Sequence, residues 1–575
     1  MAETLLSPGV LARENDQSFI QGQPVETGAA IIGPTAKGPV EIPTLITSFS
    51  EFTAVFGGAI DSGSYSYSTF TSIAANNYFQ NGGNSLLVTR VTSGTFTPAI
   101  SSDIGSISSS IEVPFVLETI SEGEIMNSNG PESSGGALAS GSKDNLRWEI
   151  ASVNTSSGAF SLLVRRGDDT RNQKVVLEQF NNLSLDPLAS NYISKVIGDV
   201  DKTLVNDGTD YFIQDSGSYP NASRYIRVKT VNFPTPNYFD NDGIAKTEFT
   251  TLLPSAGQSG SFEGATGLNY NATRAANFYN AISSSDTQGL TGSDYANAIA
   301  LMSNVDEYQF NVISVPGLIN ENDGATTQIT NIVNNSISRG DSIAIIDLVN
   351  YNSTLANVIG QASGFDNSYS ATYWPWVQTV DPNTGELVFV PASTMIPGVY
   401  AFTDASSDPW FAPAGISRGG LGQVVRAERK LTAGNRDNLY EANINPIATF
   451  PQAGVVVFGQ KTLQKKATSL DRVNVRRLLI SLKGYISQIS DTLVFEQNTI
   501  STRNSFLSQV NPYLESVQQR QGLYAFKVVM DDTNNTAGVV DRNELVGQIF
   551  LQPTKTAEYI ILDFNVLPTG ATFPS

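Results

Sequence analysis

The chain contains no cysteine and no histidine among its 575 residues, and only 15% of them are charged. Without cysteine and histidine it cannot form a disulfide, a zinc site of the Cys/His kind, or a Ser-His-Asp or Cys-His nucleophile pair. Any catalytic site would have to use carboxylates, lysine or tyrosine. Because few residues are charged, the polarity of the chain comes from uncharged residues such as serine, threonine and asparagine and from 48 glycines. This composition favours large uncharged contact surfaces.

Long apolar runs are also missing. The longest, such as 453–458 and 559–562, have the length of strands, whereas a membrane helix needs roughly 18–20 apolar residues. The N-terminus lacks the basic start and apolar core of a signal peptide. We therefore expect a soluble chain made in a cytoplasm, with no membrane insertion.

Motifs for nucleotide, metal or acid–base chemistry are weak. No lysine follows a glycine, which excludes a P-loop. The acidic stretches 240–243 and 531–535 lack the ligand spacing of a calcium loop, so we interpret them as turns. We predict no catalytic, cofactor-binding or metal-binding residue; a carboxylate-based hydrolase is the distant alternative.

The net charge of −20 and a pI near 4.5 argue against nucleic acid as the main partner. One segment differs: residues 411–485 hold twelve basic and four acidic residues. We predict that its basic face docks on an acidic surface of a partner, either a different protein or another copy of this chain. The alternative interpretation is that these basic residues form the solvated flank of a helix. The candidate residues are Arg472, Arg476 and Lys483, with Lys461, Lys465 and Lys466 nearby.

Local signals predict alternating helices and strands. Ser48 or Ser50 should cap a helix that ends at Gly57. The apolar runs 310–317 and 341–349 flank an expected helix at 325–338, which predicts a parallel βαβ unit.

Two helices are expected near the C-terminus. In 471–493, seven apolar residues fall on one helical face: Val475, Leu478, Leu479, Leu482, Ile486, Ile489 and Leu493. Asn511 followed by Pro512 predicts the start of a second helix, which should stop at Gly522.

Several segments resemble the tail sheath proteins of contractile-tailed bacteriophages, most closely the T4-like type. The resemblance begins with LLSPGV (5–10) and GAAIIGPTAKGPVEIPTLITSFSEFTAVFG (28–57). It continues through YQFNVISVPG and RGDSIAIIDLV, and it is most specific in the C-terminal stretches 390–415, 445–463 and 531–564.

The resemblance implies a fold of mixed α/β and α+β domains. An inner α/β domain would be built from N- and C-terminal segments, with an inserted subtilisin-like α/β domain, non-catalytic here, and a β-rich outer insertion. The expected division is an N-terminal arm (1–22), an N-terminal inner-domain segment (23–95), the outer insertion (96–260), the subtilisin-like domain (261–400), a C-terminal inner domain (401–567) and a C-terminal arm (568–575).

The resemblance also implies a function, that of a non-enzymatic subunit of a contractile tail sheath. Such subunits polymerise as stacked hexameric discs around the tail tube and contract to drive it through the host envelope. The implied partners are further copies, the tube protein, and baseplate and neck or tail terminator proteins, without nucleic acid. The protein would be assembled in the host cytoplasm and located in the virion tail. The sheath of a phage-tail-like bacteriocin or secretion device is the alternative.

Two sets of residues acquire roles from this resemblance. The basic face would contact the tube or the next sheath subunit. The terminal arms would add strands to sheets of neighbouring subunits, and residues 558–567 would form a strand of the shared sheet. The residues expected to take part in this strand exchange are Leu5, Leu6, Val10, Leu11, Ile560, Leu562, Phe564, Val566 and Phe573.

Overall fold

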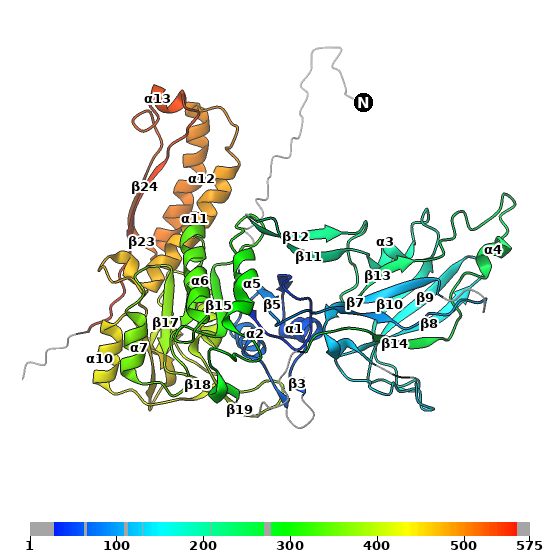
Figure 1. The fold of residues 1–575 in the computed structure, drawn as a ribbon. Helices are drawn as coiled ribbons and strands as arrows, with labels where there is room; N and C mark the ends of the chain where they lie inside the picture. Colours follow the sequence, from blue (N-terminus) through cyan, green and yellow to red (C-terminus); the bar gives the residue numbers. More distant parts are fainter. Residues whose placement is uncertain are drawn as a thin grey trace, which may run out of the picture.

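The computed structural model describes residues 28–61, 66–108, 113–128, 130, 132–208, 210–268 and 278–560. Figure 1 shows three regions: a body built on an eight-stranded sheet, a β-rich insertion to its right, and a C-terminal projection that rises from the body. Among the described residues, no helix is long and apolar enough to cross a membrane. The mixed α/β, multidomain class predicted from sequence is confirmed; the subtilisin-like assignment stays a prediction.

The sheet of the body combines strands from distant regions of the chain. Its order is β2 (Thr44–Ile46), β5 (Leu86–Arg90), β1 (Ala29–Gly33), β15 (Val312–Ile319), β16 (Ile343–Asp347), β17 (Ser370–Trp374), β21 (Asn445–Phe450) and β22 (Gly454–Val457). The six inner strands are parallel, and β2 and β22 add antiparallel edges. Strands from the three expected domain ranges 23–95, 261–400 and 401–567 thus share one sheet, which was not predicted.

Helices cover both faces of this sheet. In β1, Ala29 and Ile31 pack in one apolar core, and Ala30 and Ile32 pack in the other, because successive side chains of a strand point to opposite faces. The first core includes residues from α1 (Phe49–Phe56), α2 (Phe70–Gln80) and α8 (Ile396–Ser406). The second includes residues from α5 (Ala296–Leu301), α6 (Ala325–Arg339), α7 (Leu355–Ala362) and α10 (Ala433–Glu441).

Several local predictions for the body are confirmed. The hydroxyl of Ser48 accepts a hydrogen bond from Glu51 N and caps α1, which ends at Gly57 with a positive φ of 76°. Strands β15 and β16 are parallel and flank α6, as the βαβ prediction required. Helix α2 was missed because residues 70–78 are buried on every side, so no amphipathic pattern marks it.

Smaller elements complete the body and its margins. A three-stranded sheet has the order β19 (Leu387–Val390), β18 (Val377–Val380) and β20 (Val424–Ala427), and β3 (Ile60–Asp61) pairs with β4 (Ser66–Tyr67). The short helix α9 (Gly415–Arg418) also belongs to the body. Helices α3 (Ile193–Ile197) and α4 (Thr247–Thr250) lie in the insertion, where Ile193 and Ile197 are part of its core.

The insertion is a seven-stranded antiparallel sheet with its own core. Its order is β10 (Val176–Ser184), β9 (Ala159–Arg166), β8 (Leu146–Asn154), β14 (Ser259–Glu263), β6 (Pro98–Ser101), β7 (Phe115–Glu122) and β13 (Ile226–Val231). Trp148, Phe115 and Phe160 lie in this core. A separate hairpin, β11 (Asp201–Asn206) and β12 (Tyr211–Ser216), reaches back to the body, where Leu204 and Ile213 pack against the second core.

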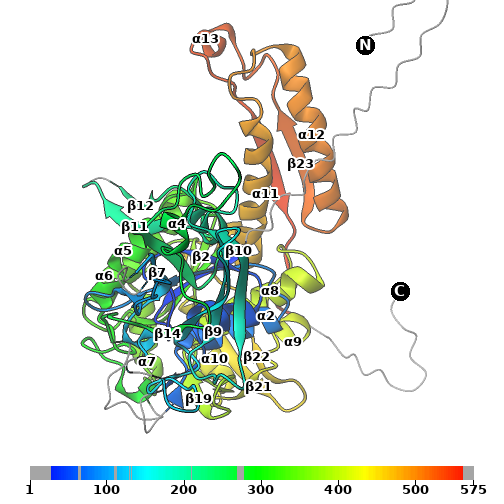
Figure 2. The ribbon, with the colours of Figure 1, turned by 90° about the vertical axis from the view of Figure 1, so that its right-hand side faces the viewer.

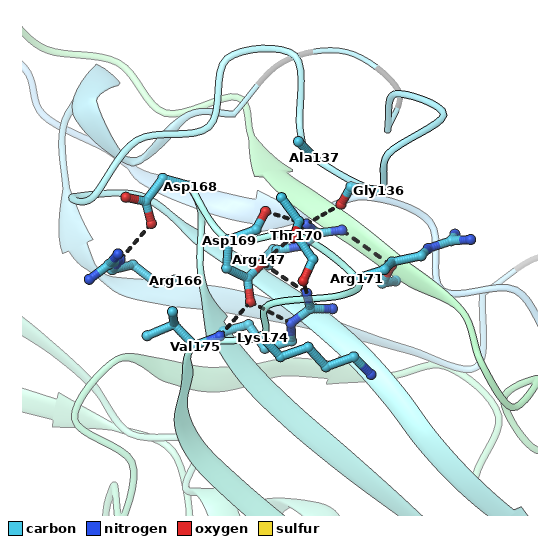
Figure 3. Close-up of polar contacts among 12 residues, drawn as sticks. Gly136, Ala137, Arg147, Arg166, Asp168, Asp169, Thr170, Arg171, Lys174 and Val175 are labelled. Carbon is cyan, nitrogen blue, oxygen red and sulfur yellow. Dashed lines mark hydrogen bonds and ion pairs between the residues drawn. The ribbon is translucent and has the colours of Figure 1, made fainter.

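A buried charge network ties two loops to the insertion sheet. The fully buried carboxylate of Asp169 accepts hydrogen bonds from Nε and Nη2 of Arg165, both at 2.8 Å, and from Nη1 of Arg147 at 3.2 Å. It also accepts from Val175 N at 2.9 Å. Figure 3 shows Asp169 at the centre of these contacts, while Arg166 and Asp168 form a separate pair. The two buried guanidinium groups therefore share Asp169 as a counter-charge, and each has one further carboxylate partner, Glu132 for Arg147 and Glu149 for Arg165.

The projection consists of α11 (Val473–Asp491), α12 (Ile500–Gln519), β23 (Leu523–Val529), α13 (Ala537–Val540) and β24 (Gln548–Pro553). Figure 2 shows it standing clear of the body, with the two helices beside the β23–β24 pair. The predicted stripe on α11 lies mostly in this region's core, where Leu478 and Leu482 contact the apolar side of α12.

The predicted start of the second helix at Asn511-Pro512 is wrong. Helix α12 begins twelve residues earlier, where the hydroxyl of Thr499 accepts from Thr502 N, and Pro512 lies inside it. The helix continues because Phe506 and Val510 before the proline pack in the same core as the residues after it. Pro512 is exposed, so water can satisfy the carbonyl that loses its backbone donor.

Asp347, at the end of β16, carries a buried carboxylate whose titration should make the stability of the body depend on pH. Its buried carboxylate accepts from the N–H of Ser393 at 3.2 Å and from its hydroxyl. Burial raises the pKa of Asp347 to about 7, although these hydrogen bonds and one from Gly317 N oppose the shift. Between about pH 4 and pH 7 the folded state holds a proton that the unfolded state has lost.

The free energy of unfolding should therefore fall as pH rises through this window, by up to about 1.4 kcal/mol per pH unit, and level off above it. Urea unfolding of Asp347→Asn at pH 5 and pH 8 should show a smaller difference than the wild type shows. The exposed Asp323→Asn variant serves as control and should keep the wild-type difference. Equal pH dependence in both variants would contradict the assignment.

Candidate assembly surfaces

The structure divides the predicted basic face into two groups. The first surrounds the loop that precedes β17. Arg476 is only 4% exposed: its Nε donates to Ser368 O at 3.2 Å, and its guanidinium carbon lies 3.9 Å from the centre of the Tyr369 ring. Burial lowers the pKa of Arg476. Nζ of Lys483 donates to the hydroxyl of the same tyrosine at 3.2 Å. Arg476 therefore does not offer an exposed charge in this chain.

Lys465, Lys466 and Lys483 are the exposed members of the predicted face. Lys465 borders the same loop, because its N–H donates to Asp366 and its Nζ donates to Ser363 O, each at 2.8 Å. These three side chains can still meet an acidic partner. Their contact with a tube or another subunit stays a prediction.

The second group surrounds Glu558. Nε and Nη2 of Arg472 donate to its two carboxylate oxygens at 2.7 and 3.0 Å, and the hydroxyl of Tyr440 donates at 2.8 Å. Burial alone would raise the pKa of Glu558, but donors that include Arg472, Tyr440 and Gln460 bring it below its usual range. Lys461 joins this group through its Nζ, which donates to Tyr440 O at 2.7 Å. Arg472 and Lys461 are thus engaged within the chain.

Sequence reasoning missed the Glu558 group. Its members are separated by 86 to 118 residues from Glu558, and nothing local in the sequence marks their meeting.

Most of the predicted arm residues lie outside the described residues: Leu5, Leu6, Val10, Leu11, Leu562, Phe564, Val566 and Phe573. Ile560 is described, and it is 78% exposed. Residues 558–560 do not belong to a strand, so the strand expected from residue 558 does not begin there.

The β23–β24 pair presents open strand edges. Within the described portion of the chain, these two strands pair only with each other. One side of the pair packs against the core of the projection, where Ile549 and Leu551 are partly buried, whereas Tyr524 and Phe550 are exposed on the strands. A two-stranded sheet with free edges is a suitable template for strand addition.

The tip of the projection exposes apolar side chains. In the turn between α11 and α12, Phe495 is fully exposed with a φ of 70° and Val494 is more than half exposed, as is Ile500 at the start of α12. Among the described residues, no group of three or more histidine, cysteine or acidic side chains is arranged to hold a metal ion. The features that stand out are therefore contact surfaces.

Two family models match the C-terminal half of the chain. The model of the phage tail sheath protein central domain matches residues 288–463, and the model of the phage tail sheath C-terminal domain matches residues 465–567. The first range covers the body from α5 to β22, and the second includes the whole projection.

Individual proteins that are similar to this chain are also tail sheath proteins. The chain is 36% identical over 263 residues to a tail sheath protein of Vibrio phage KVP40, and 34% identical over 230 residues to that of Enterobacteria phage T4. These alignments cover 45% and 40% of this chain, but only 37% and 35% of the relatives. A solved sheath tail protein from Listeria innocua has a similar fold, with a TM-score of 0.52 over 92% of this chain and 96% of its own, at 10% identity.

These matches show which class of protein this chain is similar to, the tail sheath proteins of phages. Residues 288–463 and 465–567 thus resemble the central and C-terminal domains of phage tail sheath proteins. The resemblance to T4-like sheath proteins is confirmed.

Proposed function

We propose that the chain is a subunit of a contractile tail sheath that polymerises as stacked hexameric discs around the tail tube and contracts to drive the tube through the host envelope. The observation that carries this proposal is the match of residues 288–463 and 465–567 to the two sheath domains, which together form five of the eight strands of the body sheet and the whole projection. Electron microscopy of the purified chain tests it, because a sheath subunit should form hollow helical polymers.

Strand addition links the subunits in this proposal. The terminal arms, 1–22 and 568–575, would supply strands to the free edges of the β23–β24 pair in neighbouring copies. Main-chain hydrogen bonds provide the affinity in this mode of binding. Subunits linked in this way could rotate relative to one another while they remain connected. Contraction then replaces one repeated set of contacts with a more favourable one.

The remaining partners follow from this role. They are the tail tube, the baseplate, and the neck or tail terminator proteins, and the protein would be located in the virion tail after assembly in the host cytoplasm. Catalysis, nucleic-acid binding and membrane insertion have no place in the proposal.

The exposed lysines should guide assembly on the tube. Replacing Lys465, Lys466 and Lys483 by glutamate should slow assembly on tail tubes of the same phage by roughly tenfold or more, because electrostatic attraction governs the association rate. Turbidity and electron microscopy of mixtures at low and moderate salt measure this.

A variant with glutamate at Lys143, Lys202 and Lys229, which are partly exposed on the insertion, makes the same change in net charge. It should assemble nearly as the wild type does. If both variants assembled equally slowly, or if neither assembled more slowly than the wild type, Lys465, Lys466 and Lys483 would not be part of the interface with the tube.

A further inference from the structure

The segment that follows β24 returns from the projection to the body. Thr554 is bonded to the end of the projection: its N–H donates to Gly522 O at 3.2 Å and its hydroxyl to Gln521 O at 2.7 Å. Two residues later, the hydroxyl of Thr556 accepts from Nε2 of Gln460 at 2.6 Å. After two more residues the carboxylate of Glu558 reaches the group described above. Alternate side chains, at positions 554, 556 and 558, thus hold this segment.

Glu558 makes the strongest of these attachments. Its carboxylate accepts from Arg472 at two points, from Tyr440 and, at 3.1 Å, from Gln460. The side chain is only 19% exposed. Paired hydrogen bonds between a guanidinium and a carboxylate are both stronger and geometrically more restrictive than neutral ones.

The donors belong to the body. Arg472 directly precedes α11, whose first residues, such as Val473, are buried in the first core. Tyr440 is on α10, and Gln460 is 3% exposed. A force applied to Glu558 would therefore pass into the body.

Beyond Thr554, this segment is attached by its side chains, without help from backbone hydrogen bonds. Among the described residues, 555–560 make no backbone–backbone hydrogen bond. Tyr559 and Ile560, which follow the carboxylate, are both more than three-quarters exposed. Glu558 is thus the last point at which the described chain is held before the C-terminal residues.

We propose that Glu558 anchors the C-terminal segment to the body, with Arg472, Tyr440 and Gln460 as its clamp. In a polymer, an arm held by a neighbouring copy would pull on this segment; this step rests on the proposed function. With the anchor in place, the pull is borne at Glu558. Without it, the pull falls on the weaker, neutral hydrogen bonds of Thr556 and Thr554. Once these break, it reaches Pro553, the end of β24, and opens the edge pairs with β23 one after another.

The absence of cysteine makes the anchor measurable. A single Ile560→Cys substitution in the full chain gives one site for a nitroxide label. The label should be restricted in the otherwise wild-type chain and should become mostly mobile when Glu558→Gln is added, because glutamine keeps the shape but loses the charge-assisted bonds. Glu558→Asp, which keeps the charge, should restore some of the restriction.

The matched control is Glu544→Gln, which removes a carboxylate from an exposed pair with Arg542 at the other end of the projection. It should leave the label restricted. Thermal melts of the Glu558→Gln chain should stay close to those of the wild type, which separates release of the segment from unfolding. A label that is equally restricted in wild type and Glu558→Gln, or equally mobile in both, would overturn the proposal.

Polymers test whether the anchor bears load. Under shear, Glu558→Gln polymers should break to lengths roughly tenfold shorter than wild type, and Glu544→Gln polymers should not. Equal lengths in all three would overturn the load-bearing role. If the wild type forms no polymer, the proposed function fails, and the label alone still decides whether Glu558 anchors the segment.

Discussion

Replacing Asp169 by alanine is expected to destabilise the insertion by about 3–5 kcal/mol, because two buried guanidinium groups lose the carboxylate that they share and its hydrogen bonds. Arg165 would lose both of its bonds to this carboxylate and keep Glu149, at 2.6 Å, as its remaining acidic partner. Arg147 would keep Glu132 and the carbonyl of Gly136. The loops that the network holds would then separate from the sheet.

Tryptophan fluorescence can follow this loss within the insertion. Trp148 lies in the insertion core, whereas Trp374, Trp376 and Trp410 lie in the cores of the body and the projection. Urea unfolding of chains in which those three are replaced by phenylalanine would report on Trp148 alone. In that background, Asp169→Ala should shift the Trp148 transition to much lower urea.

The neighbouring residue supplies the control. Asp168 pairs with Arg166 at 2.5 Å, and both side chains are about a third or more exposed. Asp168→Ala should therefore change the free energy of unfolding by less than about 1 kcal/mol. A similar small change for Asp169→Ala would show that the buried network is not needed to hold the insertion together.

Deleting residues 1–20 is expected to leave a folded monomer that forms no long polymers. The deletion removes the N-terminal arm of the proposed function, and with it one of the links that hold each subunit to its neighbours. Losing one of several linked contacts lowers apparent affinity by roughly 100-fold or more. Circular dichroism should match the wild type, while electron microscopy should show only short oligomers.

A full-length variant separates the effect of sequence from the effect of length. Replacing Leu5, Leu6, Val10 and Leu11 by serine should impair polymers in the same way, whereas Ser7→Ala should not. Polymers of normal length from the deleted chain would show that the N-terminal residues do not link subunits.

Local chemistry predicted many elements correctly. The cap at Ser48, the stop at Gly57 and the stripe on α11 depend on residues within a few positions of one another, so the sequence shows them directly. The helix start predicted at Pro512 was wrong because apolar residues on both sides of the proline pack in one core. The free energy gained from this packing exceeds the cost of losing one backbone hydrogen bond. The shared sheet of the body could not be read in this way, because it joins β1 to β15 across nearly 300 residues.

Contacts between distant residues also limited the prediction of the candidate surfaces from the sequence. Periodicity placed Arg472 and Arg476 beside the apolar stripe but could not show what occupies the space next to them. Tyr369 covers Arg476, and Glu558, 86 residues downstream, pairs with Arg472. A basic residue beside a buried stripe can be either solvated or paired within the fold, and the distinction needs the tertiary structure.

Electron microscopy of the purified full-length chain, with and without tail tubes, tests the central claim most directly. We expect hollow helical polymers, built from stacked rings of six subunits, that enclose tubes when tubes are present. Monodisperse monomers under all conditions, with tubes left bare, would contradict the proposed function.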